Sequence, residues 1–420
     1  MVEREVFDEG ILVIGGGISG LTTAIEAAEV GHKVILVEKE PFLGGKVAKN
    51  NKYYTKLCPP SCGLEINFKR IKKNPLIQCF TLAEVEAISG GEGNYEVTIK
   101  VNPRYVNENC TACGECAEVC TTEIQNEFNY GMDKTKAVYL PHPMAFPMRY
   151  VIAPEIIGTD EAKKCLEACK YNAIDLEMKE EIIKVKVGAI VIATGWEPYD
   201  AAKIDNLGFG RCRNVITNVM MERLASPSGP TKGKIVRPSD GKEVKNIIFA
   251  QCAGSRDENH LPYCSGVCCL VSLKQATYVR ELYPDAKATI FYIDIRALGK
   301  DEDFYTKVAA DENVSLIRGK VAEVEEDPAT FDVVVEVEDT MKGDKIRAKA
   351  DMVVLATGMV PQSPGSNIAI TYDEFGFITS DPLKRGIYGA GCVKKPTGVA
   401  QSVQDATGAA LKAIQSIVRR

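Results

Sequence analysis

Residues 10–38 read GILVIGGGISGLTTAIEAAEVGHKVILVE, and this stretch decides the expected fold. The apolar run at residues 11–14 predicts a buried strand that ends in a cluster of glycines. Residues 21–30 have the apolar spacing of a helix, and residues 34–37 form a second apolar run after it. The stretch therefore predicts a strand, a glycine turn, a helix and a second strand, which together make a βαβ unit.

The glycine turn of this unit has the spacing of a dinucleotide-binding loop. Gly15, Gly17 and Gly20 follow the GxGxxG pattern, which permits a tight turn and lets backbone N–H groups approach a pyrophosphate at the helix N-terminus. Glu38 stands at the end of the second strand, where its carboxylate can accept a ribose hydroxyl. A glycine-rich turn without a ligand would leave the position of Glu38 to chance, so we expect a dinucleotide site.

A second signal is that the same plan occurs twice. Residues 187–198, VGAIVIATGWEP, match residues 349–361, KADMVVLATGMVP, and residues 83–101 resemble residues 322–337. Each copy runs from a βαβ unit through a small meander of strands to an apolar strand that ends in Ala-Thr-Gly. We expect an α/β fold with two nested dinucleotide-binding domains.

The two copies differ in one loop. In the second copy a short hairpin joins the strands near Val337 and Ile346, whereas in the first copy some eighty residues separate the matching strands, 95–101 and 182–187. Hairpin tips tolerate insertion because the flanking strands stay paired. We therefore expect residues 103–180 to be an insert.

The domain boundaries follow from this comparison. The expected first domain is assembled from residues 1–102, 181–221 and 351–420, the insert is 103–180, and the second domain is 247–350. Residues 222–246 are rich in Pro, Gly, Ser and Lys, which predicts a linker or surface loop.

Composition limits the classes of function. The 420 residues are 45% hydrophobic and carry a net charge of -6, with Lys and Arg scattered, so no surface for nucleic acid or anionic lipid is indicated. The acidic start, residues 1–9, has no leader pattern, and no uncharged apolar run of 18 residues occurs, so we expect a protein that is neither secreted nor membrane-spanning by itself. Fifteen cysteines without a leader favour metal ligation or redox chemistry in a reducing compartment.

The insert carries cysteines at ferredoxin spacing. Cys110, Cys113, Cys116 and Cys120 form CxxCxxCxxxC, and in two-cluster ferredoxins the fourth cysteine of each motif binds the other motif's cluster. Zinc is the alternative for any cysteine cluster, but this spacing favours iron and sulfur.

The second ferredoxin motif is damaged. Cys165 and Cys169 match its last two cysteines, but Thr159 and Ala162 stand where two more thiolates are needed. We predict one 4Fe-4S cluster, held by the three close cysteines of the first motif and by Cys169, and no ligand role for Cys120. The alternative, in which Cys120 is the fourth ligand of its own motif, requires local refolding. The predicted ligands are Cys110, Cys113, Cys116 and Cys169.

The second copy lacks a phosphate loop. Its strand at 247–250 runs into QCAGSRDENHLPYCSGVCC, which has no closely spaced glycines opening a helix, and Asp294, the match of Glu38, then has no ribose to bind. We therefore predict no nicotinamide site. Four cysteines occupy this place and can supply iron ligands, although Cys268 or Cys269 could instead be a small core residue. The four are Cys252, Cys264, Cys268 and Cys269.

A third pair of cysteines, Cys58 and Cys62, lies in the sequence CPPSC shortly after Gly44-Gly45. The pair resembles the redox dithiol of two-domain flavin disulfide reductases, which lies at about this distance from the glycine loop. The resemblance implies that the pair could exchange electrons with a flavin, and a structural role is equally compatible with the sequence. Lys46 could place a positive charge near a flavin ring, or it could be a surface lysine.

The chain resembles the A-subunit family of heterodisulfide reductases over nearly its whole length. The stretches that carry the resemblance are VIGGGISGLTTAIEAAEVGHKVILVEK, CTACGECAEVC followed by IQNEFNYG, CAGSRDENHLPYCSGVCC, FYIDIRALGK and IYGAGCVKKPTGVAQSVQDATGAA. The resemblance implies a thioredoxin-reductase- and glutathione-reductase-like fold with a ferredoxin-like insert, FAD in the first copy, and an unconventional 4Fe-4S site on the four cysteines of the second copy. It also implies a flavin-contacting strand ending near Gly391 and a helix that starts near Val399. The residues expected to hold FAD are Gly15, Gly17, Gly20, Glu38, Lys39, Gly44, Gly45, Lys46, Thr194, Gly195, Gly391 and Val399.

Within this family the chain is most similar to A subunits of quinone-interacting membrane-bound oxidoreductases of sulfate-reducing bacteria, and it resembles a trimmed member that lacks the terminal domains of full-length relatives. The resemblance implies a cytoplasmic FAD and iron-sulfur subunit with two 4Fe-4S clusters. Its expected role is to relay electrons between menaquinol and adenylylsulfate reductase. Its expected place is at the inner membrane, through partner subunits that include a second flavin and iron-sulfur subunit and a membrane quinone-binding subunit. The alternatives are a heterodisulfide-reductase-type flavin subunit that could bifurcate electrons, a free-standing dithiol-disulfide reductase using Cys58 and Cys62, and a scaffold whose cofactors are structural.

Overall fold

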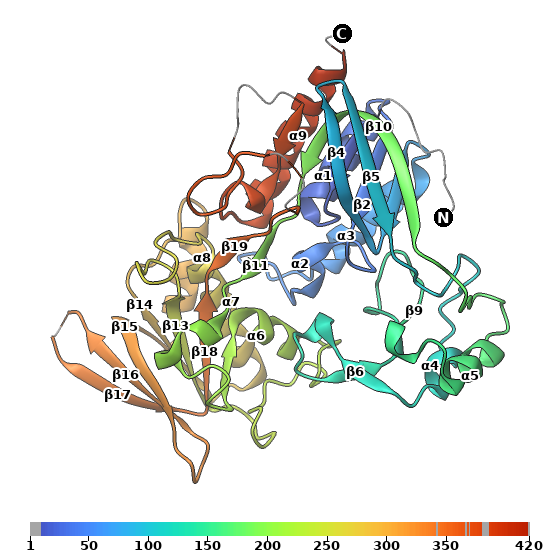
Figure 1. Cartoon of the computed structure of the whole chain (residues 1–420). Helices are drawn as coiled ribbons and strands as arrows, with labels where there is room; N and C mark the ends of the chain where they lie inside the picture. The colour runs from blue at the N-terminus through green and yellow to red at the C-terminus, as the bar shows by residue number, and fades with distance from the viewer. Residues whose placement is uncertain (1–9, 342, 366–367, 369, 380–385, 419–420) are drawn as a thin grey trace. The chain divides into compact units, whose positions relative to one another are not determined.

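The computed structural model describes residues 10–341, 343–365, 368, 370–379 and 386–418 (Figure 1). The acidic start at residues 1–9 lies outside this range. The described chain folds as two compact units. The first unit contains residues up to Ala48, Ser61–Trp196 and the chain from Pro361 onward, and the second contains Lys49–Pro60 and Glu197–Val360.

The first unit is built on a seven-stranded sheet in the order β3-β2-β1-β10-β5-β4, and β20 also pairs with β10. Every residue of β1 and β2 is buried, as expected for central parallel strands that are covered on both faces. The strands are β1 (Gly10–Ile14), β2 (Val34–Glu38), β3 (Ile77–Thr81), β4 (Ala83–Gly91), β5 (Asn94–Val101), β10 (Glu181–Ile192) and β20 (Ile387–Gly389).

Two helices from opposite ends of the chain pack together beside this sheet: α1, coloured blue, and α9, coloured red (Figure 1). Small residues of α9, among them Ala406, Ala410 and Ala413, are buried and allow a close approach. The helices of this unit outside the insert are α1 (Ile18–Glu29), α2 (Gly45–Lys49), α3 (Ser61–Lys73), the 3-10 helix η5 (Gly391–Val393) and α9 (Val399–Val418).

The insert leaves the sheet at a hairpin tip. β5 and β10 pair in antiparallel fashion from Tyr95 opposite Val187 to Val101 opposite Glu181, and residues 102–180 connect this end of the pair. The inserted elements are α4 (Glu115–Val119), β6 (Glu123–Gln125), η1 (Glu127–Asn129), β7 (Lys134–Lys136), β8 (Val138–Tyr139), β9 (Val151–Ile152), η2 (Pro154–Ile156) and α5 (Asp160–Ala168). Their short lengths and cysteine-rich core explain why no long periodic pattern marks them in the sequence.

The second unit repeats the plan of the first, in the strand order β12-β18-β13-β14-β15-β16-β17. Its strands are β12 (Val215–Thr217), β13 (Asn246–Ala253), β14 (Lys287–Tyr292), β15 (Val314–Glu326), β16 (Val333–Asp339), β17 (Lys345–Ala350) and β18 (Met352–Thr357). Its helices are η3 (Ala201–Lys203), η4 (Asp205–Leu207), α6 (Asn218–Leu224), α7 (Cys268–Leu282) and α8 (Asp301–Ala309). The pair β11 (Trp196–Pro198) and β19 (Met359–Pro361) lies where the chain passes between the units.

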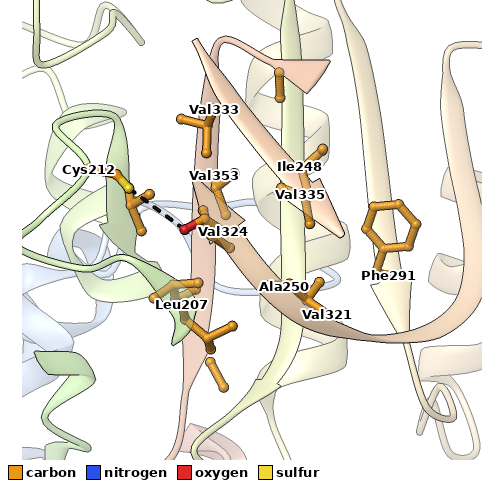
Figure 2. Close-up of a cluster of buried hydrophobic side chains, with 14 of the residues drawn as sticks. Leu207, Cys212, Ile248, Ala250, Phe291, Val321, Val324, Val333, Val335 and Val353 are labelled. Carbon is orange, nitrogen blue, oxygen red and sulfur yellow. Dashed lines mark hydrogen bonds between the residues drawn. The ribbon is translucent and has the colours of Figure 1, made fainter. Parts of the chain in front are cut away.

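A buried cluster packs the antiparallel meander of this unit against its parallel strands. Figure 2 shows Val324 and Val335 of the meander close to Ile248 of β13 and Val353 of β18. The Cys212 thiol donates a 3.9 Å hydrogen bond to the Val324 carbonyl within the same cluster. Cys212 is therefore a packing residue of this buried cluster.

The unit boundaries differ from those expected from sequence. Residues 197–221 and 351–360, which we assigned to the first domain, lie in the second unit because β12 and β18 pair within its sheet. Residues 222–246, expected to be a linker or surface loop, include the buried side chains of Ile235 and Arg237. Arg237 forms a 2.7 Å ion pair with Asp332.

In the described part of the chain, every helix is too short or too polar to cross a membrane.

Candidate flavin and iron-sulfur sites

The glycine loop of the first unit has the geometry that close backbone approach requires. Gly15 has φ +105°, and a Cβ there would lie 2.4 Å from the Ala193 carbonyl oxygen. A Cβ on Gly20 would lie 1.8 Å from the Gly15 carbonyl oxygen, so the start of α1 can pack on β1 only without a side chain. A Cβ on Gly17, in contrast, would meet no atom within 4 Å. That open position at the start of α1 fits the approach of a pyrophosphate.

Glu38 is held at the end of β2 by two backbone amides. Gly16 N donates to its carboxylate at 2.6 Å and Glu40 N donates at 2.8 Å. Burial raises the pKa of this carboxyl to about 7. The carboxylate thus lies beside the glycine loop, as an acceptor for ribose hydroxyls should.

The carboxyl ends of β1, β10 and β20 meet at the same edge. Ala193 N donates to Ile14 O at 2.7 Å, and Ala390 N donates to Ile192 O at 2.8 Å. These bonds bring Thr194, which follows β10, to the edge that holds Gly15. Parallel sheets bind ligands at this edge.

Gly195 and Gly391, at the same edge, have φ values of +75° and +73°, which favour glycine. The Gly391 amide donates to Asp405 of α9 at 2.8 Å, and Lys394 pairs with the same carboxylate at 2.6 Å. Sequence reasoning missed Asp405 because a single acidic residue inside a helix gives no signal. Val399 is the first residue of α9, as the resemblance implied.

Gly44 and Gly45 form the second glycine turn against the first. Both have positive φ, Gly44 N donates to Gly16 O at 2.8 Å, and a Cβ on Gly45 would lie 3.0 Å from the Gly17 Cα. Lys46 follows in α2 and is half-buried, whereas Lys39 is exposed. Together with Glu38 and the open position at Gly17, these residues fit a dinucleotide such as FAD.

In the insert, one small cavity is lined by Cys110, Cys113, Cys116 and Cys169. Three of these come from the first motif, around α4, and Cys169 follows α5, so the distant cysteine closes the set. Burial and then the neighbouring thiols raise the pKa of the Cys116 thiol to about 11. Four sulfurs around one cavity fit the chemistry of a 4Fe-4S cluster, whose iron would favour the thiolates.

In the second, damaged ferredoxin motif, side chains of the hydrophobic core and a helix cap occupy the positions of the missing ligands. Cys120 and Cys165 are buried in the core of the insert, and burial, followed by Cys120, raises the pKa of the Cys165 thiol to about 12. Ala162 is also fully buried, and Thr159 caps α5 by accepting a 3.4 Å hydrogen bond from the Ala162 amide. The positions that lack thiolates are thus occupied by a helix cap and a core residue.

The strand-to-helix loop of the second unit brings its four cysteines together. Cys252 lies near the end of β13, at a register shift and with φ +57°, and Cys268 and Cys269 open α7. Burial raises the pKa of the Cys268 thiol, and the next causes are its neighbours Cys252, Cys269 and Cys264. The Cys269 thiol donates to the Asp294 carbonyl at 3.5 Å. Soft sulfur ligands grouped in this way fit an iron-sulfur cluster.

Asp294 has a different role from its counterpart Glu38. Its carboxylate pairs with Arg256 and lies 3.5 Å from Arg296, whereas the Glu38 carboxylate accepts from backbone amides of the glycine turns. No closely spaced glycines open α7. In its described part, the second unit thus lacks the glycine loop beside which the first unit holds its acid.

Among the described residues, no group of three or more His, Cys, Asp or Glu side chains is arranged to hold a single metal ion. A four-iron cluster is larger than one ion and its ligands stand farther apart, so this finding bears on sites such as zinc rather than on clusters.

Cys58 and Cys62 are both free thiols; Cys58 is half-buried, and Cys62 is exposed in the first turn of α3. Cys79 of β3 is half-buried, and burial raises the pKa of its thiol to about 12.

The chain is similar to known flavin and iron-sulfur proteins. Residues 10–56 match a family described as FAD dependent oxidoreductase. The chain is 41% identical to the second of two iron-sulfur A subunits of CoB--CoM heterodisulfide reductase from Methanopyrus kandleri, over 97% of this chain and 64% of that protein. It is 38% identical to the A subunit of the H(2):CoB-CoM heterodisulfide,ferredoxin reductase of Methanothermobacter thermautotrophicus, over 98% and 64% of the two lengths. The chain thus spans 64% of the length of these relatives.

Solved structures show the fold. A thioredoxin reductase of T. acidophilum superposes with a TM-score of 0.53 at 14% identity, covering 97% of both chains. A bacillithiol disulfide reductase of Bacillus cereus gives the same TM-score at 13% identity, covering 99% of this chain and all of that one. The predicted α/β fold with dinucleotide-binding domains is confirmed. Over nearly its whole length, the chain is similar in sequence to A subunits of heterodisulfide reductases, and it shares its fold with thioredoxin reductase.

Proposed function

We propose that the chain is an FAD and iron-sulfur electron-transfer subunit of a larger oxidoreductase complex. The observation that carries this proposal is the contrast between the two copies of the dinucleotide-binding plan. One copy keeps the glycine loop with Glu38, and the other has four cysteines in the place of that loop. FAD exchanges electrons in pairs and 4Fe-4S clusters exchange them singly, so the chain would convert one mode of transfer into the other.

The residues of the chain would divide the work as follows. The turns at Gly15–Gly20 and Gly44-Gly45 would bind the pyrophosphate, and Glu38 would accept the ribose hydroxyls. Two sets of thiolates would each hold a 4Fe-4S cluster, in the insert and at the start of α7. The ligands would be Cys110, Cys113, Cys116 and Cys169 for the first cluster and Cys252, Cys264, Cys268 and Cys269 for the second.

Cofactor analysis and reduction by nicotinamides test this proposal together. We expect one FAD and about eight irons per chain, with EPR signals of reduced 4Fe-4S clusters after stepwise reduction. NADH and NADPH should leave the flavin oxidised, because the second unit lacks a nicotinamide loop. Rapid bleaching of the flavin by either nucleotide would contradict the proposal.

The relatives are named as subunits of heterodisulfide reductases, and we propose the same class of assembly for this chain. The more specific role is transfer between menaquinol and adenylylsulfate reductase, at the inner membrane through partner subunits. It is supported by the damaged ferredoxin motif, which resembles that of quinone-interacting oxidoreductases. Reconstitution with a menaquinol analogue and adenylylsulfate reductase would test it against reduction of a CoB–CoM heterodisulfide.

The alternative is a dithiol-disulfide reductase that uses Cys58 and Cys62. Two free thiols in the CPPSC stretch favour it. Cys62→Ser would then abolish turnover of a small disulfide, whereas under our proposal it would at most retune the flavin. Cys79→Ser is the matched control, since that half-buried thiol takes no part in either mechanism.

A further inference from the structure

The loop between Glu38 and Gly44 forms one wall of the proposed flavin site. Leu43 is fully buried, and a Cβ on Gly16 would lie 2.5 Å from its Cδ2 atom. Gly44 also forms a parallel bridge with Gly17. The position of Leu43 therefore sets where the two glycine turns lie relative to each other.

The other side of this loop is held by the insert. Leu43 N donates to the Phe146 carbonyl at 2.8 Å, and the ring of Phe146 stacks on Phe68 of α3 at a centroid distance of 5.1 Å. Neighbouring Phe42 packs edge-on against Phe128 of η1 at 5.4 Å and against His142 at 5.1 Å. Two consecutive residues of the flavin loop thus depend on residues 128–146 of the insert.

Arg104, three residues after the end of β5, adds a buried anchor. Its guanidinium donates to the Pro41 carbonyl at 2.5 Å, to the Thr81 hydroxyl at 2.9 Å and to the Arg149 carbonyl at 3.4 Å. The side chain is 5% exposed, and its partners are neutral acceptors rather than a carboxylate. A buried guanidinium with such partners fixes main-chain positions and gains little from charge pairing.

Arg104 therefore links the insert, through the Arg149 carbonyl, to the loop proposed to bind FAD, through the Pro41 carbonyl. A disturbance of the insert reaches the flavin loop through this residue and through Phe146.

We propose that Arg104 and Phe146 of the insert are positioning residues for FAD, so that the affinity of the chain for FAD depends on a segment outside the dinucleotide-binding fold. This inference rests on the proposed FAD site. The insert, in addition to carrying a cluster, completes the wall formed by Leu43 and Gly44.

FAD titration of the deflavinated full chain tests the proposal. Phe146→Ala should weaken FAD binding by about tenfold, since it removes an aromatic stack behind Leu43. Phe146→Tyr, which keeps the ring, should restore wild-type affinity. Leu166→Ala, on the 41% exposed face of α5 in the same insert, is the matched control and should bind FAD as the wild type does.

Two further measurements separate positioning from folding. Hydrogen exchange of the Leu43 and Gly44 amides should accelerate in Phe146→Ala while amides of β1 remain protected. Arg104→Lys keeps the charge but loses the forked donors, and it should also weaken FAD binding by about tenfold without changing thermal stability by more than a few degrees. If Phe146→Ala does not fold, the FAD affinity of Arg104→Lys tests the positioning role.

The outcomes distinguish the two proposals. If the wild-type chain binds no FAD, the proposed function fails. If the wild type binds FAD and both Phe146→Ala and Arg104→Lys bind it equally well, the positioning role is wrong while the proposed function stands.

Discussion

The two strand-to-helix loops of this chain, β1–α1 and β13–α7, occupy the same place in two copies of one fold and have diverged completely in chemistry. The first loop needs only the three glycines between Ile14 and Ile18, which bring backbone amides to the edge of the sheet. The second extends over fourteen residues between Ala253 and Cys268 and gathers four thiols instead. The carboxyl edge of a parallel sheet thus offers a protected location, and the residues in and beside the loop decide which cofactor it suits.

The acidic residue at or just after the end of the next strand, Glu38 in the first unit and Asp294 in the second, also differs between the two copies. Glu38 is held by backbone amides and stays available to a hydroxyl, whereas Asp294 pairs with Arg256. Asp294 follows a strand whose neighbouring loop lacks the glycine turn, and it forms an ion pair with a guanidinium instead.

A substitution in the glycine loop should have the largest effect on FAD binding. Gly17→Ala should leave the FAD-free fold intact, within about 0.5 kcal/mol of unfolding free energy, because the new Cβ meets no atom. It should nevertheless weaken FAD binding by roughly 100-fold, because the methyl group fills the space of the pyrophosphate. Denaturant unfolding and FAD titration measure the two effects. Gly15→Ala is the contrasting variant: its Cβ would clash with the Ala193 carbonyl, so it should lose both stability and FAD.

Iron content tests the two proposed cluster sites, including the cysteines around the β13–α7 loop. Cys252→Ser and Cys110→Ser should each lower the iron content from about eight to about four per chain, and each should remove a different EPR signal. Cys120→Ser should retain about eight, because Cys120 is a core residue of the insert. Loss of a cluster in Cys120→Ser would instead support the ligand set in which the first motif binds its cluster alone.

Substitution of the acid at the matching position of each copy, Glu38 or Asp294, should have a smaller effect on FAD binding. Glu38→Gln should weaken FAD binding by about 30-fold, since a hydrogen bond to a charged acceptor contributes about 2 kcal/mol. Asp294→Asn, the same change in the second copy, should leave FAD binding unchanged. Equal losses in the two variants would mean that the two acids do not differ in function.

Much of this arrangement could be predicted from sequence, because its signals are local. The βαβ unit at residues 10–38 is specified by periodicity and glycine spacing, and the insert by comparison of the two copies. Phe146 and Arg104 could not be found in this way, since their partners Leu43 and Pro41 are some sixty to one hundred positions away and no motif links them. The buried Arg237 was missed because its local sequence is misleading. Pro, Gly and Ser around it indicate a linker, but its partner Asp332 comes from a distant part of the chain.

The pH dependence of FAD binding is the finest test of the Glu38 site. The pKa of this carboxyl is about 7 in the folded chain and 4.5 for the ordinary side chain, so between these values the FAD-free fold holds a proton that the unfolded chain has released. Raising the pH through this window therefore destabilises the FAD-free fold. A ribose hydroxyl that donates to the carboxylate favours the ionised form, so FAD binding releases this proton and grows stronger as the pH rises through about 7. We expect the Kd for FAD to fall by about tenfold between about pH 6 and pH 8 in the wild type and to stay constant in Glu38→Gln. A flat wild-type profile would show that the ribose does not reach Glu38, and the difference between the two acids would then lie in packing rather than in ligand binding.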